Sequence, residues 1–96
     1  MSREIRWTKR AVRRLDQIGA HIAADDPGAA TRVVARIIVG VERLADHPAI
    51  GRVGRIRETR ELVFADIPYI VPYRVQTSSI EVLTVMHTAR KWPENS

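Results

Sequence analysis

The sequence predicts an α+β fold of two layers, with the element order strand, helix, helix and three strands (βααβββ). Two amphipathic helical segments follow one another in the first half of the chain, and three short apolar segments follow one another after residue 57. When helices and strands are segregated in this way, the helices pack as one layer on a sheet. The short connections between the last three strands favour an antiparallel meander. We therefore expect a helical hairpin packed on a small antiparallel sheet.

The first strand and the first helix are separated by a change of periodicity at Thr8. Residues 3–7 alternate between two faces, which is typical of a short strand. Thr8 is a suitable N-cap, because its hydroxyl accepts a hydrogen bond from a backbone N–H of the first helical turn. Apolar residues then recur at spacings of three and four and form one stripe: Val12, Leu15, Ile18 and Ile22. The opposite face of this helix is polar and includes Arg13 and Arg14.

The second helix begins and ends at strong sequence signals. Asp26 is the expected N-cap and Pro27 the first helical residue. The helix carries a broad apolar face, formed by Ala30, Val33, Val34, Ile37, Val41 and Leu44. It should end before Pro48, because the residue that precedes a proline avoids the helical region. Two helices joined by the short segment 25–27 form an antiparallel hairpin, and the breadth of the apolar face indicates that the second helix also packs on the sheet.

The rest of the chain is predicted to form a basic loop followed by the three strands. Residues 49–57 contain two glycines and the arginines Arg52, Arg55 and Arg57, which indicates a loop. The predicted strands are 58–65, 69–75 and 80–87, with turns at 66–68 and 76–79 and a polar tail over 88–96. Pro72 lies inside the middle strand and removes a ladder donor. That strand must be bulged, or the donor position of Pro72 must face out of the ladder.

Length and composition limit the class of protein. A chain of 96 residues fits a single domain over 1–96. It has no cysteine, which excludes disulfides and thiolate sites and is compatible with a reducing cytoplasm. The N-terminus has no apolar segment of the kind found in signal peptides, and the most apolar stretch, 33–41, is too short to span a bilayer. We expect a cytoplasmic protein that makes no contact with membranes.

The net charge of +5 comes from 16 lysines and arginines against 11 acidic residues. Fourteen of the cations are arginine, whose rigid fork of donors suits phosphate and carboxylate groups. An acidic partner, either a nucleic acid or an acidic protein segment, is one explanation. The alternative explanation of the positive charge is solubility, together with a preference for arginine codons in a GC-rich genome. Charge alone therefore does not identify a partner.

The order of motifs along the chain resembles the RelE/ParE superfamily of toxins. The matching residues are Trp7, Thr8, Ala11 and Leu15; Leu44, Pro48, Gly51 and Arg52; residues 59–63; Pro68, Tyr69, Ile70, Val71, Tyr73, Arg74 and Val75; and Ile80, Val82, Leu83, Val85, His87, Ala89, Arg90 and Trp92. One departure is Pro72, where the superfamily usually has a β-branched residue. The resemblance implies a growth-inhibiting toxin that a cognate antitoxin, ParD-like or RelB-like, neutralises by wrapping a C-terminal segment over it. A disordered, acidic and amphipathic segment would suit the arginines of this chain.

The resemblance leaves two toxin activities open. RelE-like members cleave mRNA on the ribosome, and ParE-like members are reported to inhibit DNA gyrase. Cleavage through the 2′-hydroxyl needs a base, an acid and cations around the phosphorane. The candidate catalytic residues for that chemistry are Arg60, His87 and Arg90, which we expect to converge at one edge of the sheet. His87 has the alternative of closing the strand end by a hydrogen bond, and Glu61 either acts as a base or pairs with an arginine.

Of the two activities, the sequence favours the ParE-like one. RelE-like enzymes use a dense basic cluster and a tyrosine near the C-terminus, and no tyrosine follows Tyr73 here. Residues expected to contact the target are Arg52, Arg55, Arg57, Lys91 and Trp92. Residues expected to contact the antitoxin are Arg13, Arg14 and Arg74, although Arg13 and Arg14 also suit a solvated helix face. The third alternative is a non-toxic binding or co-repressor module.

Cofactor and metal chemistry are not expected. The three histidines lack the spacing of zinc sites, and the chain has no glycine-rich phosphate loop or serine–histidine–aspartate signature. Tyr69 and Tyr73 share one face of a regular strand, where half-buried packing is a simpler explanation than base stacking. Trp7 and Trp92 are expected to be packing anchors, with the target-binding role of Trp92 as its alternative.

Overall fold

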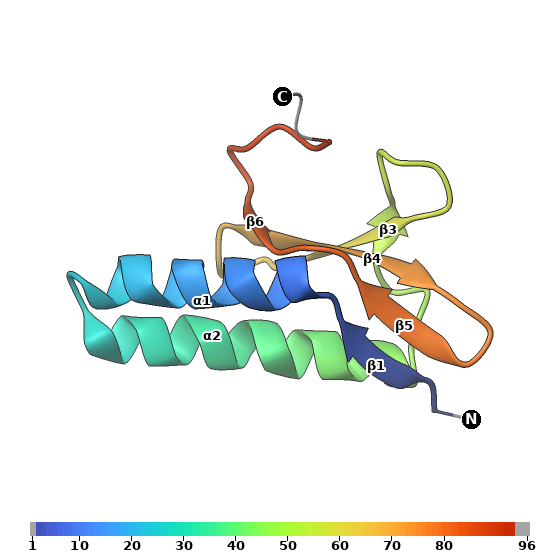
Figure 1. Cartoon of the computed structure of the whole chain (residues 1–96), viewed down its shortest axis with the longest axis horizontal. Helices are drawn as coiled ribbons and strands as arrows, with labels where there is room; N and C mark the ends of the chain where they lie inside the picture. Colours follow the sequence, from blue (N-terminus) through green and yellow to red (C-terminus); the bar gives the residue numbers. More distant parts are fainter. Residues whose placement is uncertain (1, 94–96) are drawn as a thin grey trace.

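The computed structural model of the chain describes residues 2–93 as a helical hairpin packed against a six-stranded sheet. The elements are β1 (Glu4–Trp7), α1 (Lys9–Ala23), α2 (Pro27–Glu42), the 3₁₀ turn η1 (Arg43–Ala45), β2 (Arg52–Val53), β3 (Arg60–Val63), β4 (Tyr69–Val75), β5 (Ser79–Val82) and β6 (Met86–His87). The two helices lie side by side, and the strands gather towards the end of the hairpin where α1 begins (Figure 1). The predicted α+β class and its two layers are confirmed.

The sheet is mixed, whereas the sequence predicted an antiparallel one. Its order is β1-β5-β4-β3-β2, and β6 also pairs with β4. The pairs β3–β4 and β4–β5 are antiparallel, as the predicted meander requires. β1 joins the far edge parallel to β5. Short turns connect β3, β4 and β5, so these strands must be antiparallel to their neighbours. β1 comes from a distant part of the chain, and no short turn forces β1 to be antiparallel to β5.

The predicted last strand, 80–87, is divided into β5 and β6. The interruption lies opposite Pro72: β5 pairs with β4 as far as Tyr73, and β6 resumes the pairing at Ile70. The backbone N–H of Leu83 donates to the Pro72 carbonyl at 2.9 Å, so the N–H that Pro72 lacks would face this same side. The irregularity expected around Pro72 therefore falls in the neighbouring strand, and β4 itself is continuous over the predicted residues 69–75.

The expected helix caps are confirmed. The Thr8 hydroxyl accepts a hydrogen bond from the Ala11 N–H at 3.1 Å and donates to the Val82 carbonyl at 2.9 Å. Asp26 accepts a hydrogen bond from the Ala29 N–H at 3.0 Å. Thr8 therefore does more than begin α1, because it also fixes the start of that helix to β5.

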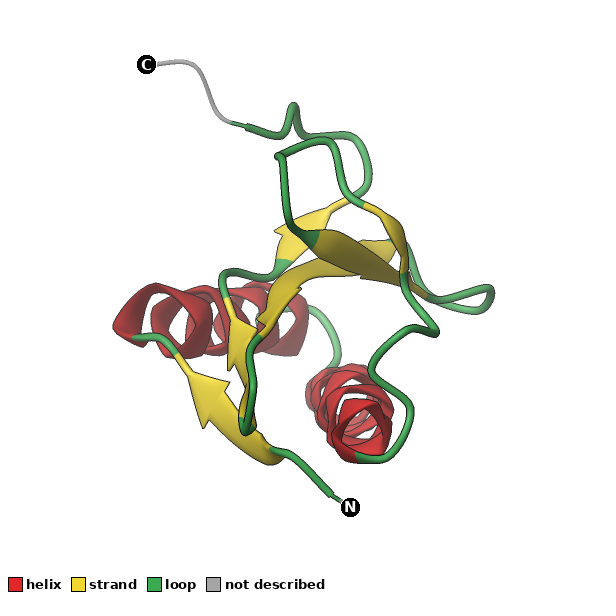
Figure 2. Ribbon diagram, turned by 90° about the vertical axis from the view of Figure 1, so that its right-hand side faces the viewer, coloured by secondary structure: helices red, strands yellow, loops and turns green. Residues whose placement is uncertain are grey.

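The core lies between the helices and one face of the sheet, which twists and curves over them (Figure 2). Alternate residues of β4, Tyr69, Val71 and Tyr73, belong to this core, so Ile70, Pro72 and Arg74 point to the opposite face. The helices contribute Ala11, Ile37, Val41 and Leu44. Among residues 2–93, no helix has the length and apolar character needed to cross a membrane.

Candidate functional site

The basic segment 49–57, which the sequence predicted to be a loop throughout, contains the short strand β2, which pairs antiparallel with β3. A buried carboxylate holds this segment. Glu61 is fully buried on the face of the sheet away from the helices, although that face has no helical cover. The Arg52 guanidinium donates to Glu61 Oε1 at 2.9 Å, and the Arg55 side chain and backbone N–H both donate to Glu61 Oε2 at 3.1 Å. Of the two roles left open for Glu61, the structure bears out the ion pair with arginine.

The electrostatics of Glu61 follow from these contacts. Burial raises the pKa of this carboxyl group, but hydrogen bonds from Arg55 and Arg52 outweigh burial and leave the pKa below its ordinary value. Glu61 is therefore a carboxylate that five hydrogen bonds already occupy. Arg52 and Arg55, which the sequence predicted to contact the target, serve this loop, while Arg57 is exposed near its end.

Arg60 and Tyr73 hold the segment that follows α2. Arg60 donates to the Gly51 carbonyl at 2.8 Å, and the Tyr73 hydroxyl donates to the Pro48 carbonyl at 2.6 Å while it accepts from the Gly51 N–H at 3.0 Å. A Cβ at position 51 would lie 2.5 Å from the Tyr73 hydroxyl oxygen, so glycine permits this close approach. The guanidinium of Arg60 is thus committed to backbone carbonyls.

The predicted catalytic residues fall in two places. Arg60 pairs with Tyr73 across β3–β4, and His87 pairs with Tyr69 across β4–β6. Tyr69 and Tyr73 are four residues apart in one strand, which separates the two positions by about 13 Å at the usual rise of a strand. His87 and Arg90, in contrast, line the same groove. The structure therefore brings two of the three together and leaves Arg60 apart.

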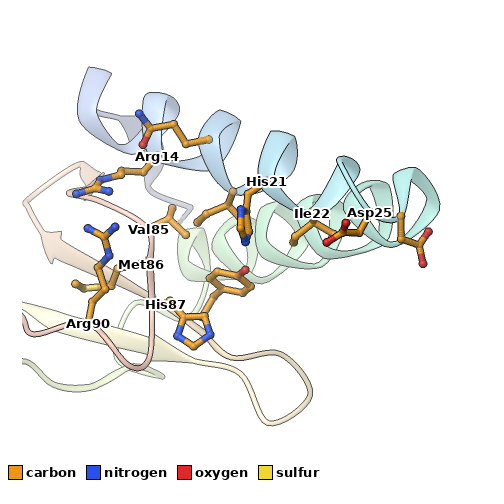
Figure 3. A pocket seen from close by; sticks show the side chains of 12 residues that line it. Arg14, His21, Ile22, Asp25, Val85, Met86, His87 and Arg90 are labelled. Carbon is orange, nitrogen blue, oxygen red and sulfur yellow. The ribbon is translucent and has the colours of Figure 1, made fainter.

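That groove lies between α1 and β6 and has a volume of about 650 Å³. We call it the α1–β6 groove; its lining residues are Arg14, Gln17, Ile18, His21, Ile22, Asp25, Asp26, Tyr69, Val85, Met86, His87 and Arg90. Arg14 and Arg90 point towards one another at one end, and Asp25 lies at the other (Figure 3). Apolar side chains lie between the two ends. The polar side chains of Gln17, His21 and His87 line the groove beside these apolar ones, and its ends carry opposite charges.

His87 forms the strand-end contact that was expected as its alternative role. Its Nδ1 accepts a hydrogen bond from the Ala89 N–H at 3.0 Å. Its ring meets that of Tyr69 edge to face, with centroids 5.4 Å apart. With Nδ1 occupied as an acceptor, Nε2 is the nitrogen that carries the proton in the neutral ring. His21 of α1 lies on the opposite wall of the groove (Figure 3).

The residues predicted to contact an antitoxin do not share one surface. Arg14 lines the α1–β6 groove, whereas the adjacent Arg13 is exposed and does not. Arg74 pairs with Glu81 at 3.0 Å on the sheet face away from the helices. In the tail, the Arg10 guanidinium lies 5.7 Å from the centre of the Trp92 ring, so Trp92 sits beside the start of α1, and Lys91 is exposed. This contact agrees with the expected packing role of Trp92.

The sequence did not single out most of the groove. Gln17 and His21 belong to the polar face of the first predicted helix, and Asp25 belongs to the segment that connects the two helices. The sequence does show a polar helix face that continues into a turn with two aspartates. The position of this face opposite His87, however, depends on the pairing of β6 with β4, which the sequence does not show. Within residues 2–93, no three or more histidine or acidic side chains come together as metal ligands.

Comparisons with known proteins match toxins of toxin–antitoxin systems, under ParE and RelE names. The family model described as "ParE toxin of type II toxin-antitoxin system, parDE" matches residues 5–92. A curated relative, the putative toxin Y4kP of Sinorhizobium fredii, is 63% identical over 98% of both chains. Toxin RelE2 of Caulobacter vibrioides is 32% identical over 91% of this chain and 97% of its own length.

Two solved structures share the fold. A chain of a chromosomal ParDE toxin–antitoxin system from P. aeruginosa superposes with a TM-score of 0.81 at 26% identity, over 90% of this chain and 96% of that chain. A chain of the RelBE2 toxin–antitoxin complex from Mycobacterium tuberculosis gives a TM-score of 0.69 at 20% identity, over 91% and 99%. At that identity the second likeness concerns the fold alone.

Proposed function

Because the chain belongs to the ParE toxin family of type II toxin–antitoxin systems, we propose that it arrests bacterial growth by inhibiting DNA gyrase. A cognate antitoxin, encoded by a neighbouring gene and ParD-like in type, holds the toxin inactive. The toxin acts in the cytoplasm, where its target lies, and needs no cofactor. Since the chain carries a net charge of +5, an acidic antitoxin segment is electrostatically favoured.

The separation of Arg60 from His87 is the observation that carries this proposal. An RNA-cleaving site needs its base, acid and charge-stabilising cations within hydrogen-bond reach of one phosphate. Positions about 13 Å apart along a strand do not meet that need. Arg60 donates to the Gly51 carbonyl, and Glu61 is already occupied by Arg52 and Arg55. These contacts support a toxin that binds its target rather than one that cleaves RNA through the predicted three residues.

Purified toxin tests the proposal in two parallel assays. We expect it to block the supercoiling of relaxed plasmid by DNA gyrase, and to leave mRNA intact on translating ribosomes. The purified antitoxin, added in equal amount, should restore supercoiling and provides the control for specificity. Unimpaired supercoiling together with mRNA cleavage would overturn the proposal.

A RelE-like endoribonuclease is the second candidate, supported by His87 and Arg90 in the α1–β6 groove. Arg14 and His21 line the same groove, so cations and a proton-transfer group lie close to one another. This candidate predicts that ribosome-bound mRNA is cleaved and that His87→Ala abolishes cleavage. A third candidate, a non-toxic co-repressor, predicts normal growth when the chain is expressed without its antitoxin.

A further inference from the structure

We propose that the exposed face of α2 pairs with the same face of a second copy of this chain. We call this surface the α2 outer face; its residues, all exposed, are Thr31, Arg32, Ala35, Ile38, Val39 and Glu42. The two copies are related by a two-fold axis at the level of residue 37, so the two α2 helices run antiparallel. This inference goes beyond the proposed function and does not depend on it.

The centre of the α2 outer face is apolar. The side chains of Val39 and Ile38 are 55% and 37% exposed, and Ala35 lies one turn before them. α1 packs beside α2 in the hairpin and adds Val12, which is 45% exposed (Figure 1). Exposed apolar side chains that lie close together gain free energy when apolar groups of a partner remove them from water. This part of the hairpin therefore favours contact with another apolar surface.

A shallow groove between α1 and α2 provides room for side chains of the second copy. It has a volume of about 430 Å³ and is lined by Gly19, Ala30, Thr31, Val34, Ala35 and Ile38. Most of these residues are small, so the surface of the hairpin is low here. An antiparallel copy centred on residue 37 places the partner's Val39 opposite Ala35, at this groove. By symmetry, Val39 of the first copy meets the partner's Ala35, so a large side chain faces a small one twice.

The charges on the two sides of the apolar centre are self-complementary. Arg32 and Glu42 lie equally far before and after residue 37, so the same antiparallel copy places the partner's Glu42 opposite Arg32 and the partner's Arg32 opposite Glu42. Within residues 2–93, neither Arg32 nor Glu42 forms an ion pair in the single chain. Arg43, which is exposed beside Glu42, faces the uncharged Thr31 of the partner subunit. The pairing therefore forms two ion pairs and opposes no like charges at these positions.

These two relations favour a second copy over a partner of another sequence. In a two-fold contact each residue that meets a second residue is met by that same residue of the other copy. Opposite charges, and a small and a large side chain, must then lie at equal distances from one centre, as Arg32 and Glu42 and Ala35 and Val39 do. Packed helices lie about 8–10 Å apart, which arginine and glutamate side chains can bridge. Because exposed ion pairs are weak, the apolar centre provides the affinity and the charges set the register.

Sedimentation equilibrium of the purified full chain tests the inference. We expect the average mass to rise from 10.9 kDa towards twice that value as the protein concentration increases. Arg32→Glu and Glu42→Arg each place like charges opposite one another, and each should weaken the dimer at least about tenfold. Arg57→Glu reverses an exposed arginine between β2 and β3, far from α2 in the chain, and should change the dissociation constant less than about threefold. Circular dichroism and thermal melting establish that each variant is folded.

Mixing the two charge variants makes the test independent of their stability. An equimolar mixture of Arg32→Glu and Glu42→Arg should form heterodimers with nearly the affinity of the wild type, because each acidic position then faces a basic one. The doubly substituted chain should dimerise on its own for the same reason. Since the chain has no cysteine, Ile38→Cys, next to the two-fold axis, should form a disulfide-linked dimer on oxidation, and Arg57→Cys should not. Non-reducing electrophoresis distinguishes the two.

Three results would overturn the inference. The first is a mass of 10.9 kDa at every concentration up to about 0.5 mM. The second is a mixture of Arg32→Glu and Glu42→Arg that associates no better than either variant alone. The third is a wild-type chain that stays monomeric while Val39→Glu weakens its binding to the product of the neighbouring gene, because the α2 outer face then serves a different protein. None of these results bears on the inhibition of DNA gyrase, so the proposed function is tested separately.

Discussion

Glu61 and Tyr73 show how two single residues organise loops that contain no regular structure. Glu61 gathers Arg52 and Arg55 around a buried carboxylate, and Tyr73 fastens Pro48 and Gly51 through its hydroxyl. A buried carboxylate is stable as an ion only when such partners surround it. These contacts explain why a loop rich in arginine has a defined path beside the sheet.

Replacing Glu61 with glutamine should destabilise the protein at neutral pH. Glutamine keeps the shape but leaves Arg52 and Arg55 facing a neutral group. We expect the free energy of unfolding at pH 7 to fall by about 2 kcal/mol, since both arginines are partly exposed and regain water. Urea denaturation followed by circular dichroism measures this change. Glu81→Gln, which removes a half-exposed partner of Arg74, is the control and should cost less than about 1 kcal/mol.

The same variant has a pH dependence with a defined sign. The pKa of Glu61 is lower in the folded protein than in the unfolded chain, because the hydrogen bonds from Arg55 and Arg52 outweigh burial. Its contribution to stability is therefore complete above the unfolded pKa of about 4.3 and is lost as the pH falls through the folded pKa. The difference between wild-type and Glu61→Gln should shrink between pH 7 and pH 3. A difference that stays constant over this range would show that charge is not its cause.

At the scale of elements, α2 packs closely against side chains of β3 and the residue after it at Gly40. A Cβ at this position would lie 2.5 Å from the ring of Phe64, the residue that follows β3. Arg36, one turn earlier in α2, places its guanidinium 4.8 Å from the centre of the same ring. Glycine is unfavourable inside a helix, so its presence here reflects the need for close packing rather than for local helix formation.

Two identical substitutions in α2 should therefore change stability in opposite directions. Gly40→Ala gains helix propensity but forces the Phe64 ring to move, and we expect a net loss of about 1–3 kcal/mol. In Gly28→Ala the new Cβ would lie 3.3 Å from the end of the flexible Arg32 side chain and at an ordinary 3.5 Å from Asp26 Oδ1, so this change should stabilise the protein by about 0.5–1 kcal/mol. Thermal or urea unfolding of both variants provides the comparison. A stabilising Gly40→Ala would mean that α2 can shift away from Phe64 at little cost.

At the scale of the whole molecule, charge should govern how fast the antitoxin binds. The chain has a net charge of +5, and the start of α1 concentrates four cations beside the α1–β6 groove. Long-range attraction of this kind accelerates encounter and is screened by salt. The attraction acts at long range, before short-range contacts form, so it affects association more than dissociation.

The association rate with the antitoxin should therefore fall at least about tenfold between roughly 0.05 and 0.5 M NaCl, while the dissociation rate changes less. Stopped-flow or biolayer interferometry resolves the two rates. Sucrose at matched viscosity is the control for slower diffusion. A salt effect confined to the dissociation rate would contradict long-range steering and indicate that short-range ion pairs carry the charge dependence.

The sequence by itself determined the local elements and the family. Thr8, Asp26 and Pro27 act within one or two turns of their own position, so the helix starts could be predicted without knowledge of the fold. The turn before Tyr69 and the alternation of β4 are equally local, and the middle strand has the predicted bounds. Patterns of this kind depend on backbone geometry and solvent, which act in the same way in any fold.

Only the tertiary structure decided which residues meet. β1 pairs parallel to β5, and the pairing of the last strand with β4 is interrupted opposite Pro72, because pairing partners are chosen among distant segments by packing and by available donors. That choice separates Arg60 from His87 and sets His87 and Arg90 opposite Arg14 in one groove. Side-chain periodicity assigns a face to each residue, but it contains no distance between elements, and the candidate site depends on such distances.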